Sequence, residues 1–506
     1  MRVIHTLIVS TFAWGAATTQ AAVDSSDLGP VLELDLPGAI ALALTANRDI
    51  QSAYLGRISE EYSLRVAEDR FRPDLDLIAD GEIGQSGDRS NPFDTEVAAL
   101  SQRLSLLAPT GGAVSLTWAN RRESTPSGAA TYEAGLELSV VQPLLRGGGF
   151  AVNRAPVRIA RINERINVLT LRSTINRIIT DVVTGYRQLM LEERRLDIAE
   201  RSLIRARRLL ETNRALIDAG RMARQDIVQT EADASQRELD LVSAQNTADS
   251  ARLALLDTLD IDPETRLKLT KTLRLEEAGG LDFETAYARA LASRPTYLQA
   301  LLRLEIARID TRTARNERLW RLDASVTASV AGFSDEGPGA ALEDWNDDPV
   351  QYRAGLQLTV PIGDRSRKRG VIDAEVARRR LELSAQEVRE AVRIDIKDRV
   401  RTIESLRRQV DLAQRAAELA ARQLEIENLK LSQGRSSNFQ VLDFENQLIT
   451  AQINEATAEV SYLNARTQLD EALGTSMETW RIPFEVRRYE NHDLILTGDP
   501  VREVQR

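Results

Sequence analysis

The strongest constraint on the fold of this 506-residue chain is an internal duplication. Residues 34–44 (LDLPGAIALAL) are similar to residues 281–291 (LDFETAYARAL), and residues 132–140 (YEAGLELSV) are similar to residues 352–360 (YRAGLQLTV). A third match has a Gly-Arg pair and then a glutamate eleven residues after the glycine, in Gly220, Arg221 and Glu231 and again in Gly434, Arg435 and Glu445. Three matches in the same order indicate a tandem repeat, so we expect two halves of similar fold.

Each half is predicted to contain a helix, a group of strands and a long helical hairpin, in that order. The first half has these bounds: residues 23–275, with strands at about 74–141 and the hairpin at about 152–260. The second half has these bounds: residues 276–475, with strands at about 322–361 and the hairpin at about 371–473. Residues 476–506 are interpreted as a polar C-terminal tail.

Residues 1–22 are interpreted as a secretory signal peptide. They have a positive start at Met1-Arg2, a mostly apolar stretch and small residues at Ala21 and Ala22 where cleavage would occur. The chain has no cysteine, which excludes lipid attachment through an N-terminal cysteine. Beyond the signal there is no run of about 18 apolar residues, so the sequence also excludes helical membrane spans.

The predicted hairpins carry the residue spacing of coiled coils. In the first hairpin, apolar residues recur every seven positions, at Leu189, Leu196, Leu203, Leu210 and Ile217. The second hairpin alternates steps of three and four, at Ile403, Leu406, Val410, Ala413, Ala417, Ala420 and Leu424. Residues 371–431 contain no proline or glycine and could extend roughly 90 Å as a helix. These helices alone would fit a simple coiled-coil rod equally well.

Two of the predicted strands alternate apolar with polar or small residues. Their apolar sides hold Tyr132, Leu136 and Leu138 in the first half and Tyr352, Leu356 and Leu358 in the second. Strands of about ten residues with one apolar face are typical of transmembrane barrels, so these side chains are predicted to face lipid. One sheet of a soluble β-sandwich is the alternative, but the very long helices around each strand group make such stacking difficult.

The small number of strands in one chain has a further consequence. A membrane barrel cannot leave an open strand edge in lipid, because the unpaired backbone groups would have no water to bind. One chain has too few strands to enclose a wide pore, so several chains must share the barrel. Residues 97–120 look like an extra hairpin, which either adds two strands to the barrel or lies at the membrane surface.

The sequence offers little that could support catalysis. Its only histidines are His5, in the signal, and His492, in the tail, so no Ser-His or Cys-His nucleophilic site and no histidine-based metal site is expected. There is no phosphate-binding P-loop. The net charge of −10 argues against binding of nucleic acid. We therefore predict a protein that is not an enzyme and needs no cofactor or metal.

The sequence resembles the TolC family of outer-membrane efflux proteins over nearly its whole mature length. The resemblance lies in the duplicated order and in residues 34–44, 71–73 (FRP), 142–145 (QPLL), 219–226 (AGRMARQD) and 433–443 (QGRSSNFQVLD). It implies a fold that is mainly α with membrane β: a homotrimer in which four strands per subunit form a shared outer-membrane β-barrel, continuous with a periplasmic α-helical barrel. It also implies docking to a periplasmic adaptor (membrane fusion) protein and an inner-membrane transporter.

The resemblance also indicates where such a channel would be gated. Family members carry acidic rings close to the turn of the second hairpin, and Asp443 matches one of the two positions. The other position is Gln440 here, so the sequence does not support a double acidic ring. Asp226 matches a position in the family's closed-state network, and Arg221, Arg224 or Arg435 could clamp the closed state through ion pairs.

Simpler explanations remain open for these residues. An aspartate in the first turn of a helix is favoured by the helix dipole, which would account for Asp226 and Asp443. The arginines are more commonly solvated surface residues. Gly220 and Gly434 match the adaptor-docking turns of the family, yet a chain reversal needs a permissive residue in any case.

The leading prediction is an outer-membrane channel subunit with a periplasmic extension. It would give passive exit to substrates delivered by an adaptor and a pump, in tripartite efflux or in type I secretion. The alternatives are a periplasmic adaptor, which should have one hairpin flanked by lipoyl halves, and a non-transporting coiled-coil scaffold. The sequence does not indicate whether the cargo is drugs, metals or proteins.

Overall fold

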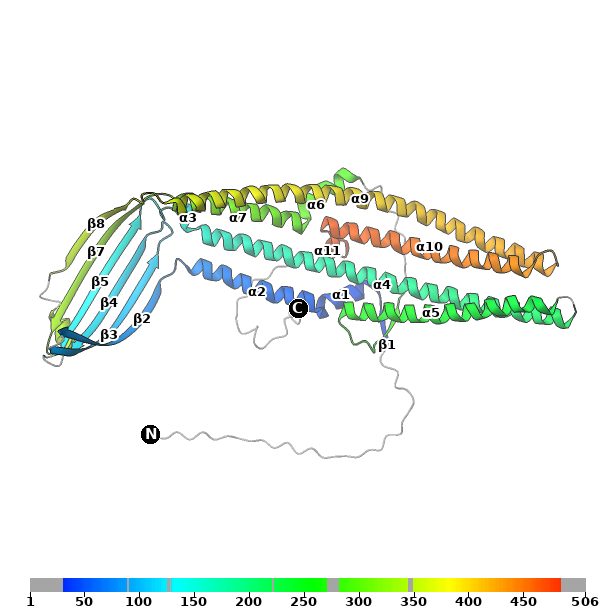
Figure 1. The fold of residues 1–506 in the computed structure, drawn as a ribbon, viewed down its shortest axis with the longest axis horizontal. Helices are drawn as coiled ribbons and strands as arrows, with labels where there is room; N and C mark the ends of the chain where they lie inside the picture. Colours follow the sequence, from blue (N-terminus) through cyan, green and yellow to red (C-terminus); the bar gives the residue numbers. More distant parts are fainter. Residues whose placement is uncertain are drawn as a thin grey trace, which may run out of the picture.

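The chain forms one elongated molecule, with a β-sheet at one end and two helical hairpins that reach to the other (Figure 1). It is seen here in a computed structural model that describes the following residues: 31–88, 91–124, 128, 130–220, 223–270, 282–344 and 349–483. The predicted signal segment 1–22 lies outside the described residues.

Both halves follow the predicted order of helices, strands and helical hairpin. The first half contains β1 (Val31–Leu34), α1 (Leu36–Ala46), α2 (Arg48–Asp69), β2 (Asp74–Asp88), β3 (Asn91–Leu107), β4 (Ala113–Ser124), β5 (Thr131–Pro143), α3 (Phe150–Asn153), α4 (Ala155–Asp218), the 3₁₀ helix η1 (Arg224–Asp226), α5 (Ile227–Leu259) and β6 (Arg266–Leu269). The second half contains α6 (Phe283–Ser293), α7 (Pro295–Glu317), β7 (Arg321–Ser334), α8 (Pro338–Glu343), β8 (Gln351–Thr359), α9 (Arg365–Ser432), α10 (Asn438–Leu473) and α11 (Ser476–Thr479).

The large sheet has six strands in the order β2-β3-β4-β5-β7-β8, and each neighbouring pair is antiparallel. The hairpin expected at residues 97–120 forms most of β3 and β4, so it belongs to this sheet and is not a separate elaboration. The sheet of one chain therefore has six strands, two more than the four per subunit that the family resemblance implies for the barrel. The first half contributes four of the six strands and the second half contributes two.

A compact turn allows β3 and β4 to pair directly. The N–H of Ala108 donates to the carbonyl of Gly112 at 2.6 Å. Gly111 has a φ of +93°, and a Cβ at this position would lie only 2.3 Å from the carbonyl oxygen of Gly147. Glycine is required here both for the backbone conformation and for the close approach. The turn is thereby packed against the segment that leaves β5 for the long helix α4.

The hairpins are built as the heptad spacing predicts. Helix α4 packs against α5 and α9 packs against α10, while α4 also contacts α10, which joins the two hairpins. The seam positions Leu189 and Ile403 are buried. Helix α9 begins at Arg365, earlier than the predicted start at 371, because Asp364 caps it and the helix continues through Gly370. No helix in the described part of the chain combines the length and the apolarity that a membrane span requires.

Elements from both ends of the described chain pack around the middle of α4, an arrangement that the sequence analysis did not predict. Strands β1 and β6 form a separate parallel pair. The hydroxyl of Tyr186 on α4 donates to the carbonyls of Leu34 and Thr270, at 3.1 Å each, and thereby fixes this pair to the helix. Met477 is buried in the same core. The interpretation of residues 476–506 as a polar tail is therefore wrong for α11, and residues 484–506 lie outside the described part.

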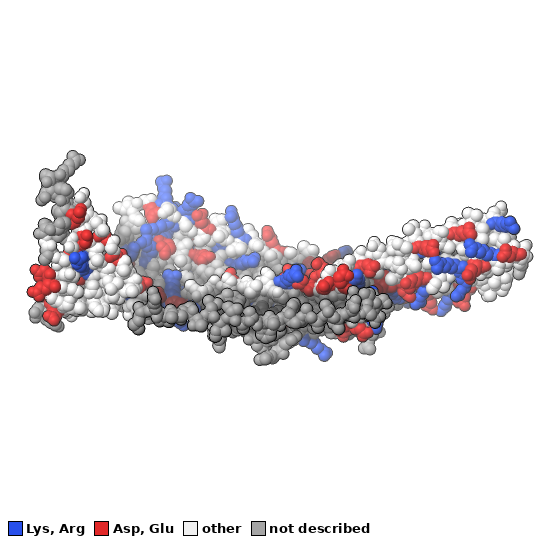
Figure 2. Space-filling model, turned by 90° about the horizontal axis from the view of Figure 1, so that it is seen from below, with Lys and Arg blue, Asp and Glu red and all other residues white. Residues whose placement is uncertain are grey.

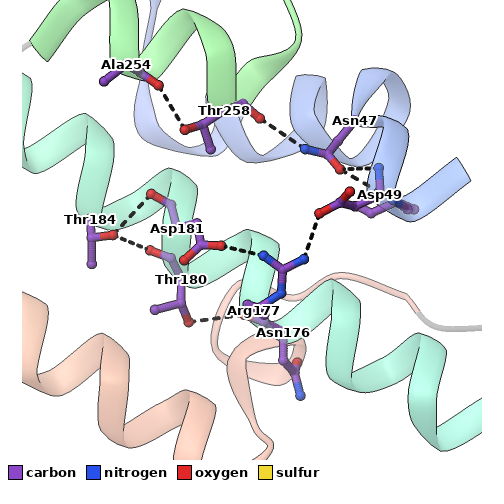
Figure 3. Close-up of polar contacts among 10 residues, drawn as sticks. Asn47, Asp49, Asn176, Arg177, Thr180, Asp181, Thr184, Ala254 and Thr258 are labelled. Atoms are coloured by element: carbon purple, nitrogen blue, oxygen red, sulfur yellow. Dashed lines mark hydrogen bonds and ion pairs between the residues drawn. The ribbon is translucent and has the colours of Figure 1, made fainter. Parts of the chain in front are cut away.

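Polar contacts hold α2 against α4 and α5 at the same level of the molecule (Figure 3). Asn47, the N-cap of α2, donates from Nδ2 to the carbonyl of Thr258 at 3.1 Å. Arg177 on α4 donates to Asp49 at 2.8 Å and to Asp181 at 3.0 Å. Burial raises the pKa of Asp181 even though Arg177 acts in the opposite direction. This cluster thus combines stabilising contacts with a carboxylate that is costly to keep ionised.

Glu471 on α10 makes the stability of this region depend on pH. Burial is the largest cause that raises the pKa of Glu471, and the charge of Asp181 adds to it. A carboxyl group with a raised pKa binds its proton more tightly in the folded state, so its contribution to stability falls as pH rises through its unfolded and folded pKa values. Glu471→Gln should therefore raise the melting temperature at pH 7 and reduce the gain that acidification to pH 5 gives the unmodified protein.

Thermal unfolding followed by circular dichroism at the two pH values measures both effects. Glu264→Gln, at an exposed loop position, is the control and should change neither. A Glu471→Gln variant that gains as much from acidification as the unmodified protein would show that Glu471 is not the titrating group.

Candidate functional site: the tips of the helical hairpins

The turns of both hairpins lie at the end of the molecule farthest from the sheet (Figure 1). Gly220 has a φ of +69° and Gly434 has a φ of +71°, in the left-handed region that favours glycine. Their N–H groups donate at 2.9 Å to the carbonyls of Ile217 and Leu431, respectively. Open space surrounds the place where a Cβ would lie at either position. The two glycines are therefore needed for backbone conformation and not for a close approach.

A capping box begins α10 directly after the second turn. The hydroxyl of Ser437 accepts from the N–H of Gln440 at 3.4 Å, and Oε1 of Gln440 accepts from the N–H of Ser437 at 3.3 Å. Gln440 is thus engaged in starting the helix. Asp443 lies beyond the first turn, since α10 begins at Asn438. The simpler explanation of Asp443 as a residue that stabilises the helix start is therefore wrong.

Asp443 lies on the exposed side of α10. The buried side of the helix at this level holds Val441 and Glu445. Gln440 and Gln447 are exposed like Asp443, and Nε2 of Gln447 donates to the Asp443 carboxylate at 2.8 Å. The three polar residues form an exposed strip on α10.

The other predicted gate residues belong to the same end of the molecule. Arg435 is exposed, and its N–H donates to the carbonyl of Lys430 at 2.8 Å and so completes the turn. Asp226 is the last residue of η1, directly before α5. Arg221 lies outside the described residues. The pairing of either arginine with Asp226 stays a prediction.

Ion pairs between the hairpins are the main feature that the sequence analysis missed. Nε of Arg205 on α4 lies 2.6 Å from Oε1 of Glu445 on α10. Arg237 on α5 is buried, pairs with Asp233 at 3.0 Å, and donates to Oδ1 of Asn446. Burial raises the pKa of Glu445, while Arg205 and Arg237 act in the opposite direction. Two arginines of the first hairpin therefore hold α10 of the second.

The internal duplication identifies Glu445 as the counterpart of Glu231, but it does not indicate that the partner of Glu445 lies on the other hairpin. Glu445 and Glu231 are equivalent positions of the repeat, and each pairs with an arginine of α4. Glu231 lies 3.1 Å from Arg214 within the first hairpin, and its side chain is 48% exposed. The side chain of Glu445 is only 8% exposed, because α10 is packed against the first hairpin. The equivalent glutamate is thus buried and pairs between the hairpins in the second half only.

Further arginines of α4 continue this contact towards the middle of the molecule. Arg194 pairs with Glu459 at 3.0 Å. Arg187 donates to the carbonyl of Leu463 at 2.7 Å and to the hydroxyl of Thr467 at 2.8 Å. Burial lowers the pKa of Arg187 to about 10, so it stays charged at neutral pH. Charged groups of both signs are interspersed along the helices out to the tips (Figure 2).

A cleft of about 640 Å³ lies between the two hairpins near their tips. Its walls combine the ion pair of Arg205 and Glu445 with apolar residues of both hairpins, such as Leu216 and Leu431. Gly434 also lines the cleft. The contact between the hairpins is therefore incomplete at the tips, where the ion pair of Arg205 and Glu445 adds to the packing of Leu209 against the apolar core of the second hairpin.

The other end of the molecule presents a sheet with two unlike faces. Paired residues of neighbouring strands share a face, and the pairings of Leu116 with Leu138, Leu138 with Ala328, and Ala328 with Tyr352 follow one apolar row across four strands. The same face holds all the side chains predicted to meet lipid: Tyr132, Leu136, Leu138, Tyr352, Leu356 and Leu358. The opposite face carries most of the charged residues of the sheet.

The described residues show no grouping of three or more acidic or histidine side chains that could hold a metal ion. The clustered carboxylates described above are each partnered by arginine or amide side chains. What this arrangement offers is a set of electrostatic contacts between helices and an exposed polar strip at the tip.

Loss of Arg205 should destabilise the protein more than loss of Arg214. Arg205→Ala leaves the buried Glu445 carboxylate without its closest partner, which we expect to cost about 1–3 kcal/mol. Arg214→Ala removes an exposed pair and should cost at most about 1 kcal/mol. Thermal unfolding of the two variants at pH 7 measures the difference. The double variant Arg205→Ala/Glu445→Gln should recover part of the loss, and equal effects of the two single variants would contradict a special role for the buried pair.

Comparison with known proteins identifies the family to which this chain belongs. A protein-family model described as "Outer membrane efflux protein" matches residues 39–259 and 286–475. The comparison with curated proteins found no match. Among solved structures, CusC is 16% identical, with a TM-score of 0.67 over 87% of this chain and 91% of that chain.

Two outer-membrane proteins have the same fold, with sequence identities and TM-scores similar to those of CusC. The CmeC channel of Campylobacter jejuni is 17% identical, with a TM-score of 0.67 over 87% of this chain and 86% of that chain. VceC of Vibrio cholerae is 17% identical, with a TM-score of 0.66 over 87% of this chain and 96% of that chain. At these identities the likeness establishes the fold. Because the family model covers both halves of the duplicated chain, the chain belongs to the outer membrane efflux protein family, and its place is the outer membrane.

Proposed function

We propose that the chain is one subunit of a homotrimeric outer-membrane channel that gives passive exit to substrates. An inner-membrane transporter and a periplasmic adaptor would deliver these substrates, in tripartite efflux or type I secretion. The observation that carries the proposal is the open, two-faced sheet at one end of a long helical body. An apolar outer face and a polar inner face are what a water-filled barrel in lipid requires.

The open edges of the sheet support a shared barrel. β2 and β8 each have one neighbour in the sheet, and the backbone groups on their outer sides need partners if the sheet lies in lipid. All nine residues of β8 are exposed in the single chain. Further copies of the same sheet would satisfy both edges and close the barrel.

The exposed strip on α10 supports a gate at the opposite end. In a trimer, three copies of Asp443 would meet around the axis, repel one another and attract cations. Gln440 adds no second acidic ring, and its side chain is occupied by the capping box. The turns at Gly220 and Gly434 are the surfaces we propose for adaptor docking, because they are the parts of the chain farthest from the membrane end.

The two alternatives are disfavoured by particular features. A periplasmic adaptor with one hairpin would not need two hairpins joined by partly buried ion pairs, as α4 and α10 are here. A coiled-coil scaffold would not need a sheet whose apolar face leaves Leu356 74% exposed. The channel is not proposed to act as an enzyme, so the energy for transport has to come from the transporter.

The proposal is tested by the assembly and conductance of the full-length protein. Outer-membrane fractions should contain a trimer that dissociates only on heating, and the purified trimer should form single channels in planar lipid bilayers. A soluble monomer without conductance would overturn the proposal and favour the scaffold.

Neutralising Asp443 should change the channel at its periplasmic end. If three Asp443 carboxylates line the aperture, Asp443→Ala should relieve block by divalent cations and raise the single-channel conductance in their presence. Asp443→Glu keeps the charge and serves as the matched control, which should retain the block. Unchanged conductance and unchanged block in Asp443→Ala would place the gate elsewhere.

A charge on the apolar face of the sheet should prevent assembly. Leu356→Arg would place a guanidinium in lipid, at a cost of about 2–4 kcal/mol per copy near the bilayer midplane. Gln357→Arg, one residue along the same strand, points to the opposite face and should be tolerated. The amounts of trimer in outer-membrane fractions give the answer. Trimers of Leu356→Arg at normal levels would mean that this face does not meet lipid.

A further inference from the structure

We propose that β8 of one copy pairs with β2 of the next, so that all six strands of each subunit enter the shared barrel and three copies form an 18-stranded wall. This inference rests on the proposed trimer. It adds to it the number of strands and the two edges that meet. A shared barrel of this kind would be about 1.5 times as wide as one with four strands per subunit, since barrel diameter grows roughly linearly with strand number.

The direction of the strands permits this closure. β2 leaves the helical end of the molecule at Asp74, and β8 returns to the helical end at Thr359 (Figure 1). The two edge strands therefore run in opposite directions, as an antiparallel pair requires. Neither strand contains a proline, so each can offer its N–H groups to a neighbour.

The apolar face continues across the added strands. Leu75, Leu77 and Ile83 on β2 are 74%, 70% and 81% exposed. Pairing places Leu75 beside Leu104 of β3, and Leu104 beside Leu116 of β4, in the same row as the apolar residues of β5, β7 and β8. A hairpin lying at the membrane surface would have no reason to continue this row. The outer face of β2 is thus built like that of the other strands.

A stagger between subunits gives the closure a definite register. Within one subunit, successive strand pairings connect Arg353 on β8 with Asp74 on β2 in a single row across the sheet. The row passes through Thr327, Ser139, Ser115 and Ser105. A barrel with tilted strands must return to its start at a shifted position. Aligning the strand ends at the helical side sets Thr359 opposite Asp74 of the next copy, which is a shift of six residues from Arg353.

This register brings opposite charges together on the inner face. On β2 the inner side carries Asp74, Asp76, Asp80 and Glu82, whereas on β8 the only charged inner residue is Arg353. With Thr359 opposite Asp74, Arg353 lies opposite Asp80 of the neighbouring copy, and Gly355 lies opposite Ile78. Cross-strand pairs of opposite charge stabilise a ladder, and like charges directly opposite destabilise it. The two edges are therefore complementary in charge and in backbone direction.

Cysteine cross-linking in the full-length protein tests this pairing, and the natural absence of cysteine makes each pair specific. Ile78→Cys with Gly355→Cys should form a disulfide between copies in outer-membrane fractions, because directly opposed Cβ atoms lie about 4.5–5.5 Å apart. The expected result is a shift of the monomer band to covalent dimers and trimers on a denaturing gel without reductant. The pairs Asp76→Cys with Gln357→Cys, and Asp80→Cys with Arg353→Cys, follow the same register.

The control pair tests whether β2 and β3 belong to the barrel. If β2 and β3 were outside the barrel, β8 would instead meet β4, and the same alignment of strand ends would set Gly355 opposite Thr117. Cross-linking of Thr117→Cys with Gly355→Cys, and none in the three β2 pairs, would overturn the inference. The inference would also be overturned if the single variant Gly355→Cys forms a stable trimer but none of the three β2 pairs cross-links. Failure of that single variant and of the unmodified protein to form any trimer would instead count against the proposed function.

Discussion

The unpaired backbone at the two edges of the sheet is the constraint on which the rest of this structure depends. A strand edge in water can bind solvent, but an edge in hydrocarbon has no such partner. An open six-stranded sheet that lies in lipid would therefore need other chains, and this need supports the proposed shared barrel. The β3–β4 turn packs against the segment that leaves β5, because Gly111 approaches the carbonyl of Gly147 closely.

In the helical body, two long hairpins lie side by side although few large apolar residues are available to hold them together. Small seam residues such as Ala417 and Ala420 bring α9 and α10 close together. Between the hairpins, arginines of α4 reach carboxylates and carbonyls of α10, from Arg187 near the middle to Arg205 near the tip. Such contacts are directional and depend on charge, so they fix the register of the hairpins where apolar packing alone would allow sliding.

Periodicity made much of the fold predictable, because heptads and alternating strands depend only on local spacing. The phase of the strands could be predicted for the same reason, and the register places Tyr132 and Leu356 on one face. What depends on contacts distant in sequence could not be predicted: the β1–β6 pair, the burial of Met477, and the membership of β3 and β4 in the sheet. In the candidate site, Gln440 and Asp443 could be located from the turn, but the partner of Glu445 lies 240 residues away on α4.

The positions of Glu445 and Asp443 connect the contact between the hairpins with the proposed gate. Because they lie two residues apart on a helix, their side chains point in directions about 160° apart. Glu445 faces Arg205 and the first hairpin, while Asp443 lies on the exposed side. Any rotation or shift of α10 relative to the first hairpin that moves Asp443 must also strain or break the pair of Arg205 and Glu445, because the helix is rigid at this scale. A gate built on Asp443 is therefore held by the contact that joins the hairpins, and the energy that opens it has to exceed what Arg205 and Arg237 contribute.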